Sequence, residues 1–129
     1  MDTKSNTSRL GIRVGIFWFA AILLCINVLG SFRVNAETEA DYVKAGCTGI
    51  IEYVLPDKTR VDCLTTTHAI EYDWGHKWAE AVGQSLHYAA YTGRRAGIVL
   101  ITPNARHEAR LRMLIAHYNL PIDLWIVEG

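Results

Sequence analysis

The chain has 129 residues, of which half are hydrophobic and a fifth are charged, a composition that excludes a disordered chain and a collagen-like array. Basic and acidic residues balance, 13 against 13. The charge is unevenly distributed, because residues 1–36 hold four basic residues and one acidic residue, a net charge of +3. Residues 37–129 hold nine basic and twelve acidic residues, a net charge of −3. A net-negative domain excludes non-specific binding of nucleic acid through bulk charge.

Residues 1–36 have the parts of a secretory signal peptide. A basic start is followed by an apolar run over residues 16–30 and by a short polar stretch that ends in Val34-Asn35-Ala36. The run is shorter than the roughly twenty residues that a membrane-spanning helix needs. We therefore predict cleavage after Ala36 and export of residues 37–129, so that the protein is periplasmic or secreted. The alternatives are an uncleaved membrane anchor over residues 14–30 and a buried core helix.

Two cysteines, Cys47 and Cys63, remain in the predicted exported part, because Cys25 leaves with the signal peptide. An even number of cysteines in an oxidising compartment permits one disulfide bond. The spacing does not show whether the two residues come within reach of each other. Two small buried thiols are the preferred interpretation.

Hydrophobic patterning predicts one α/β domain over residues 37–129, with the element order α-β-β-β-α-β-α-β. Turn residues between the first three strands favour an antiparallel meander. The expected strands are residues 49–55, 59–64, 68–74, 96–102 and 122–127. The expected helices are residues 37–45, 75–91 and 103–118.

Acidic residues stand inside the apolar strands of the predicted meander. Glu71 and Asp73 are two residues apart and so share one face of the third strand. Asp62 and Glu52 lie in the middle of the two preceding strands. Buried charges are costly unless they are paired or bound to a metal, and an all-oxygen site favours Mg²⁺ or Mn²⁺. We therefore predict a metal site formed by Asp62, Glu71 and Asp73, with Glu52 as a further candidate. The alternative is a solvent-facing polar side of the sheet.

The helix that follows the meander carries a polar stripe. At 100° per residue, Lys77, Gln84 and Tyr88 lie within a narrow sector. The expected core face is centred about 110° away, on Trp78, Val82, Ser85 and Ala89. A lysine near a metal site can orient a water or stabilise charge on a phosphate. The alternative is a solvated lysine on a helix surface.

These residues resemble the motifs of the PD-(D/E)XK nuclease superfamily. The matching residues are Asp62 in Arg60-Val61-Asp62, Glu71, and the helix segment Gln84-Ser85-Leu86-His87-Tyr88. The nearest branch is the one with a Q-x-x-x-Y helix motif, as in RecB-type exonuclease domains. The resemblance covers most of residues 37–118 and implies a restriction-endonuclease-like αβββαβ core.

The resemblance also implies roles for individual residues. Asp62 and Glu71 would be the catalytic, metal-binding carboxylates, with Mg²⁺ or Mn²⁺ as cofactor. Gln84 and Tyr88 would support the site and contact nucleic acid.

One departure from the family pattern concerns the lysine expected two residues after the glutamate, where this chain has Asp73. Lys77 can replace it from the start of the helix. The alternative is an inactive relative that keeps the fold. The family often places a further acid on the first helix, and the sequence does not distinguish among Glu37, Glu39 and Asp41.

The sequence thus predicts an exported, metal-dependent phosphodiesterase that acts on nucleic acid, in which Lys77 activates the attacking water. A second hypothesis is a non-catalytic binding or assembly module on the same fold, favoured by Asp73 at the lysine position and by the small size. A third is an unrelated periplasmic domain with a solvent-exposed polar strand face. Metal binding separates the first hypothesis from the third, and turnover separates the first from the second.

Overall fold

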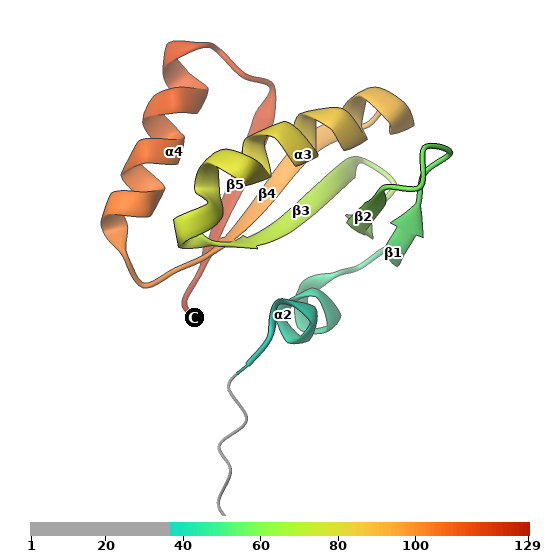
Figure 1. Cartoon of the computed structure of the whole chain (residues 1–129), viewed down its shortest axis with the longest axis horizontal. Helices are drawn as coiled ribbons and strands as arrows, with labels where there is room; N and C mark the ends of the chain where they lie inside the picture. The colour runs from blue at the N-terminus through green and yellow to red at the C-terminus, as the bar shows by residue number, and fades with distance from the viewer. Residues whose placement is uncertain (1–36) are drawn as a thin grey trace, which may run out of the picture. The chain divides into compact units, whose positions relative to one another are not determined.

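A five-stranded mixed sheet in the order β1-β2-β3-β4-β5 organises residues 37–129, the part of the chain that the computed structural model describes (Figure 1). The strands are β1 (Ile50–Val54), β2 (Arg60–Leu64), β3 (His68–Trp74), β4 (Arg95–Ile101) and β5 (Ile122–Val127). The helices are α2 (Glu39–Gly46), α3 (Trp78–Thr92) and α4 (Ala105–His117), and the 3₁₀ turn η1 (Gly75–Lys77) precedes α3. The predicted α/β class is confirmed.

The pairing of the strands changes from antiparallel to parallel at β3. β1 pairs with β2 and β2 with β3 in antiparallel register, which confirms the predicted meander. β3 pairs with β4 and β4 with β5 in parallel register. Parallel neighbours need a crossover connection, and α3 and α4 provide the two crossovers.

The prediction of one continuous helix from residue 75 was wrong for its first turn. Residues Gly75–Lys77 form the 3₁₀ turn η1. The residue before it, Trp74, makes no capping hydrogen bond with its side chain. Gly75 packs so closely on Thr102 and His107 that a Cβ atom would lie 2.4 Å from the Thr102 hydroxyl oxygen. The close approach therefore requires glycine and shapes the entry of the chain into α3.

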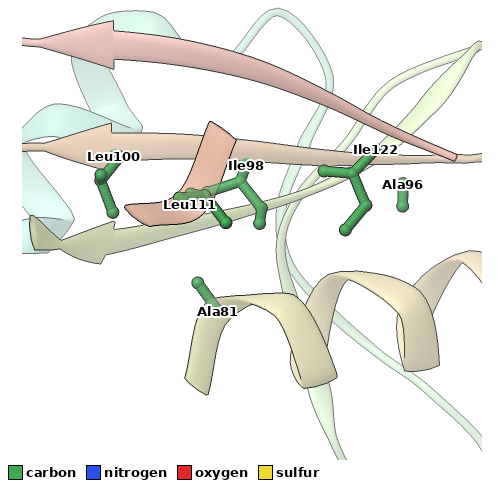
Figure 2. Packing of buried hydrophobic residues seen from close by; sticks show 6 residues of the cluster. All are labelled: Ala81, Ala96, Ile98, Leu100, Leu111 and Ile122. Atoms are coloured by element: carbon green, nitrogen blue, oxygen red, sulfur yellow. The ribbon is translucent and has the colours of Figure 1, made fainter. Parts of the chain in front are cut away.

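Both faces of the central strand β4 are buried. Ile98 and Leu100 pack with Ala81 of α3 and Leu111 of α4 (Figure 2). Val99 points to the opposite face, as alternation along a strand requires. There it packs in a cluster with Val43 of α2 and Cys63 of β2. Burial on both faces explains why the sequence of β4 is continuously apolar.

Helix α2 is tied to the sheet by a disulfide bond between Cys47 and Cys63, whose Cα atoms are 5.7 Å apart. The preferred interpretation of two free thiols was therefore wrong. The pairing depends on α2 lying over the face of β2 that carries Cys63, which the spacing of the cysteines does not reveal. Of the eight residues of α2, only Val43 is buried, so the covalent link is a major part of the attachment of α2.

Loss of this disulfide should lower the free energy of unfolding by about 3 kcal/mol, the value expected when a loop of about 15 residues is no longer closed in the unfolded chain. The residues are 16 apart in the sequence. The measurement is urea unfolding of the wild type with and without dithiothreitol, beside the Cys47→Ala/Cys63→Ala double variant. Dithiothreitol should not affect the double variant. A wild-type midpoint that does not change on reduction would contradict the prediction.

None of the helices in residues 37–129 has the length and apolar character to cross a membrane. The predicted signal peptide, its cleavage site and the alternative anchor lie outside the described residues.

Candidate active site

A polar cavity of about 370 Å³ lies between α3, β3, the N-terminal part of α2 and the β1–β2 hairpin. Six residues predicted from the sequence line it: Asp62, Glu71, Asp73, Lys77, Gln84 and Tyr88. Glu39, one of the three candidate acids of the first helix, also lines the cavity, together with four residues that the sequence did not indicate: Lys58, Thr59, Arg60 and Glu80. The predicted constellation is therefore brought together in one place.

Asp62 lies where the ladder between β2 and β3 ends. The two strands pair at Cys63 with Ile70 and at Leu64 with Ala69. One residue further on, the Asp62 carboxylate accepts a hydrogen bond from the Tyr72 backbone N–H at 2.8 Å. This side-chain bond satisfies a backbone donor that the ladder leaves without a partner strand, and it fixes the carboxylate beside β3.

The Lys77 ammonium group lies between two carboxylates. Its Nζ atom is 3.2 Å from Asp73 Oδ1 and 3.5 Å from Glu39 Oε2. Asp73 also accepts a hydrogen bond from the Trp74 backbone N–H at 2.9 Å. The hydrogen bond to Asp73, the largest effect, raises the pKa of Lys77. Lys77 therefore pairs with Asp73 and Glu39, and it remains protonated at neutral pH.

Of the three acidic residues at the first helix, the structure brings Glu39 to the cavity. The Asp41 carboxylate instead accepts a hydrogen bond from the Thr38 backbone N–H at 2.8 Å, at the start of α2. The Glu37 carboxylate accepts one from the Tyr42 hydroxyl at 2.8 Å. The Thr38-x-x-Asp41 spacing is a capping-box signal, so the sequence contained a reason to set Asp41 aside.

Burial strongly perturbs the two central carboxyl groups. It raises the pKa of Glu71 to about 9, with further contributions from the charges of Asp62 and Asp73. Burial also raises the pKa of Asp62 to about 6, against the lowering effect of the hydrogen bond from Tyr72. Glu71 is 5% exposed and Asp73 2%, so the alternative of a solvent-facing polar strand is wrong for these two residues.

The polar stripe of α3 is turned further toward the sheet than predicted. The fully buried residues of α3 are Ala81, Ser85 and Tyr88. Ser85 belongs to the predicted core face, whose other members, Trp78, Val82 and Ala89, are partly buried and pack against the core. The Tyr88 side chain belongs to the hydrophobic cluster beside β2 and β3. Burial and the nearby Glu71 charge raise its pKa to about 12. Tyr88 therefore contributes to the core and to the cavity wall at once.

Glu52 is placed differently from the other candidates. It was predicted as a buried carboxylate in mid-strand, but β1 is an edge strand and exposed along its whole length. Glu52 has a φ of 56° and forms an ion pair with Arg60. It does not line the cavity that holds the other carboxylates.

The carboxylates of Asp62 and Glu71 are the groups of the cavity that would hold a divalent cation, with water or substrate as its other ligands. Among residues 37–129, no three or more histidine, cysteine, aspartate or glutamate side chains are arranged to hold a metal ion. Mg²⁺ usually keeps several waters and binds through one or two carboxylates together with substrate phosphates. Asp62 and Glu71 suit such a site, because Glu71 Oε2 is buried with no hydrogen-bond partner among the described residues. A cation there would also offset the repulsion between the carboxylates.

No protein-family model, curated protein or solved structure matches this chain. The chemistry assigned to the cavity therefore depends on its own residues.

Proposed function

We propose that residues 37–129 form a metal-dependent phosphodiesterase of the PD-(D/E)XK type that cleaves nucleic acid. The observation that carries the proposal is the common cavity of Asp62, Glu71 and Lys77, with Gln84 and Tyr88 in its wall. The element order α2-β1-β2-β3-α3-β4 supports a restriction-endonuclease-like core.

In this proposal Asp62 and Glu71 hold Mg²⁺ or Mn²⁺. The chemistry that such a cation supplies is neutralisation of charge on the phosphoryl group and activation of water. Lys77 donates a hydrogen bond to the attacking water or to a phosphate oxygen. Because its pKa is raised by Asp73, Lys77 acts as a positioned charge and not as the base that removes the proton.

The second candidate function is a binding or assembly module without catalysis. The observation that favours it is the pairing of Lys77 with both Asp73 and Glu39. The two carboxylates offset the positive charge that a phosphate would otherwise meet. A module of this kind would keep the cavity but turn over no substrate.

Export to an oxidising compartment is part of the proposal. The Cys47–Cys63 disulfide supports it, since disulfides persist in secreted and periplasmic proteins and are rare in the cytosol. The predicted signal peptide over residues 1–36 would supply the route.

Mn²⁺ or Mg²⁺ should support cleavage of DNA or RNA by the wild type, and EDTA should abolish it. The same cations should raise the melting temperature, because they bind only the folded state. Asp62→Asn should remove both effects, whereas Glu108→Gln on α4, away from the cavity, should change neither. The measurements are gel assays with single- and double-stranded DNA and RNA, and thermal unfolding with and without metal.

The outcomes separate the two candidate functions. An equal metal response in the wild type and in Asp62→Asn would contradict the metal site. A metal response without cleavage of any substrate would favour the binding module.

A further inference from the structure

Three cationic side chains line the acidic cavity: Lys58, Arg60 and Lys77. Lys77 is held by Asp73 and Glu39, and Arg60 is paired with Glu52. Lys58 has no carboxylate within 4.0 Å among the described residues, which leaves it as the cation available to an anion from solution.

Lys58 is held in an unusual backbone conformation. Its φ is 74°, in the left-handed region that costs a side-chain-bearing residue about 1–2 kcal/mol. The turn is fixed on both sides of Lys58. Its backbone N–H donates to the Leu55 carbonyl at 2.9 Å, and the Asp57 carboxylate accepts hydrogen bonds from the Thr59 N–H and hydroxyl at 3.0 and 2.7 Å. A lysine in place of glycine or asparagine here suggests that its side chain has a use.

A contact with α3 fixes the turn beside the cavity. The Asp57 carboxylate lies 2.7 Å from His87 Nε2, and Figure 1 shows the β1–β2 turn near the C-terminal half of α3. His87 precedes Tyr88, which lines the cavity. The position of Lys58 is therefore set by tertiary contacts and not by the hairpin alone.

We propose that Lys58 binds the phosphate next to the scissile phosphate in a nucleic acid strand. The inference deepens the proposed function and rests on it, because that function places the scissile phosphate at Asp62 and Glu71. Lys58 precedes Asp62 by four residues, so their Cα atoms are separated by at most about 13 Å, the length of four residues in an extended strand. The lysine side chain and one nucleotide step together span that separation. The preferred substrate is then an oligonucleotide strand with at least two consecutive phosphates, not an isolated phosphodiester.

The net charge of the domain makes a local cation necessary. Acidic side chains outnumber basic ones both in residues 37–129 and around the cavity. A nucleic acid strand that enters the cavity therefore gains no attraction from the net charge of the domain. Its second phosphate is stabilised only by a basic side chain that is not already paired with a carboxylate. Lys58 meets that condition.

The test compares the thymidine dinucleotide TpT, which has one phosphate, with TpTpT, which has two. Binding is measured by NMR titration in Ca²⁺, and the oligonucleotides are checked for cleavage afterwards. The wild type should bind TpTpT about tenfold more tightly than TpT, the scale of one hydrogen bond to a charged group. Lys58→Asn should remove this gain while keeping the turn, because asparagine tolerates the left-handed region. It should also reduce the slope of log K against log salt for TpTpT by about 0.7.

Two variants serve as controls. Lys58→Arg keeps the charge and should keep the gain in affinity. Arg110→Gln on α4 removes the same charge away from the cavity and should leave the gain unchanged.

The outcomes distinguish this inference from the proposed function. An equal gain in the wild type and in Lys58→Asn would overturn the role of Lys58, as would failure of the wild type to bind either oligonucleotide. A Lys58-dependent gain with no cleavage when Mn²⁺ replaces Ca²⁺ would support the phosphate site and contradict the enzyme.

Discussion

Replacement of Lys77 with alanine should lower nuclease turnover by roughly two to three orders of magnitude, the scale for loss of a charge stabiliser in the transition state. The Lys77 ammonium lies 3.2 Å from the buried Asp73 and lines the same cavity as Asp62 and Glu71. The fold and metal binding should remain, because the Lys77 side chain is 41% exposed and the proposed metal ligands are other residues. The melting temperature should fall, because the buried Asp73 loses its cationic partner.

The measurement is single-turnover cleavage with Mn²⁺ by the wild type and Lys77→Ala, with the melting temperature of each recorded beside it. Lys77→Arg keeps a positive charge and should recover part of the rate. Lys44→Ala, which alters a lysine of α2 that does not line the cavity, should have no effect. Unchanged turnover in Lys77→Ala would remove Lys77 from the mechanism.

Without metal, the protein should lose stability as the pH rises from about 4.5 to about 9. The pKa of Glu71 is raised from 4.5 to about 9 in the folded state, chiefly by burial, so the folded state holds this proton more tightly than the unfolded chain. The resulting stabilisation is fully present below the unfolded pKa and is lost as the pH rises through the folded pKa. The raised pKa of Asp62, about 6, acts in the same direction over the lower part of this window.

Glu71→Gln should remove most of this pH dependence and should be more stable than the wild type at pH 8 in EDTA. Glutamine keeps a neutral group of the same shape and carries no buried charge. Mg²⁺ at pH 8 should restore stability to the wild type and not to Glu71→Gln.

The measurement is urea unfolding in EDTA at several pH values between 5 and 8. Glu108→Gln on α4 is the control and should keep the wild-type slope. Asp57 and Asp123 do not confuse the result, because hydrogen bonds lower their pKa values and they titrate below this window. Metal-free stability that is constant or rises over this range would contradict a protonated, buried Glu71.

Local patterning was sufficient for the elements of the fold. Strands β3 and β5 have the predicted bounds, because alternation and apolar runs reflect which backbone segments are buried. The turn residues between the first strands predicted the meander.

The sequence also predicted which residues meet in the cavity, but not how far the polar face of α3 is turned toward the sheet. Helical periodicity shows which residues of α3 share a face, and it does not show how far that face is turned toward the sheet. The structure buries Tyr88, which the prediction had placed on the polar stripe of the helix. For Glu52, the sequence showed a carboxylate in an apolar strand but not that this strand lies at the edge of the sheet.

The sequence by itself determined the α/β class, the order of the elements and the acidic character of the meander, because these depend on residues close together in the chain. The tertiary structure decided the rest. It paired Cys47 with Cys63 and selected Glu39 from three acidic residues near the start of α2. It also placed Lys58 on the same cavity as Lys77. These contacts join segments far apart in the chain, and their distances follow from how α2 and the hairpin pack on the sheet.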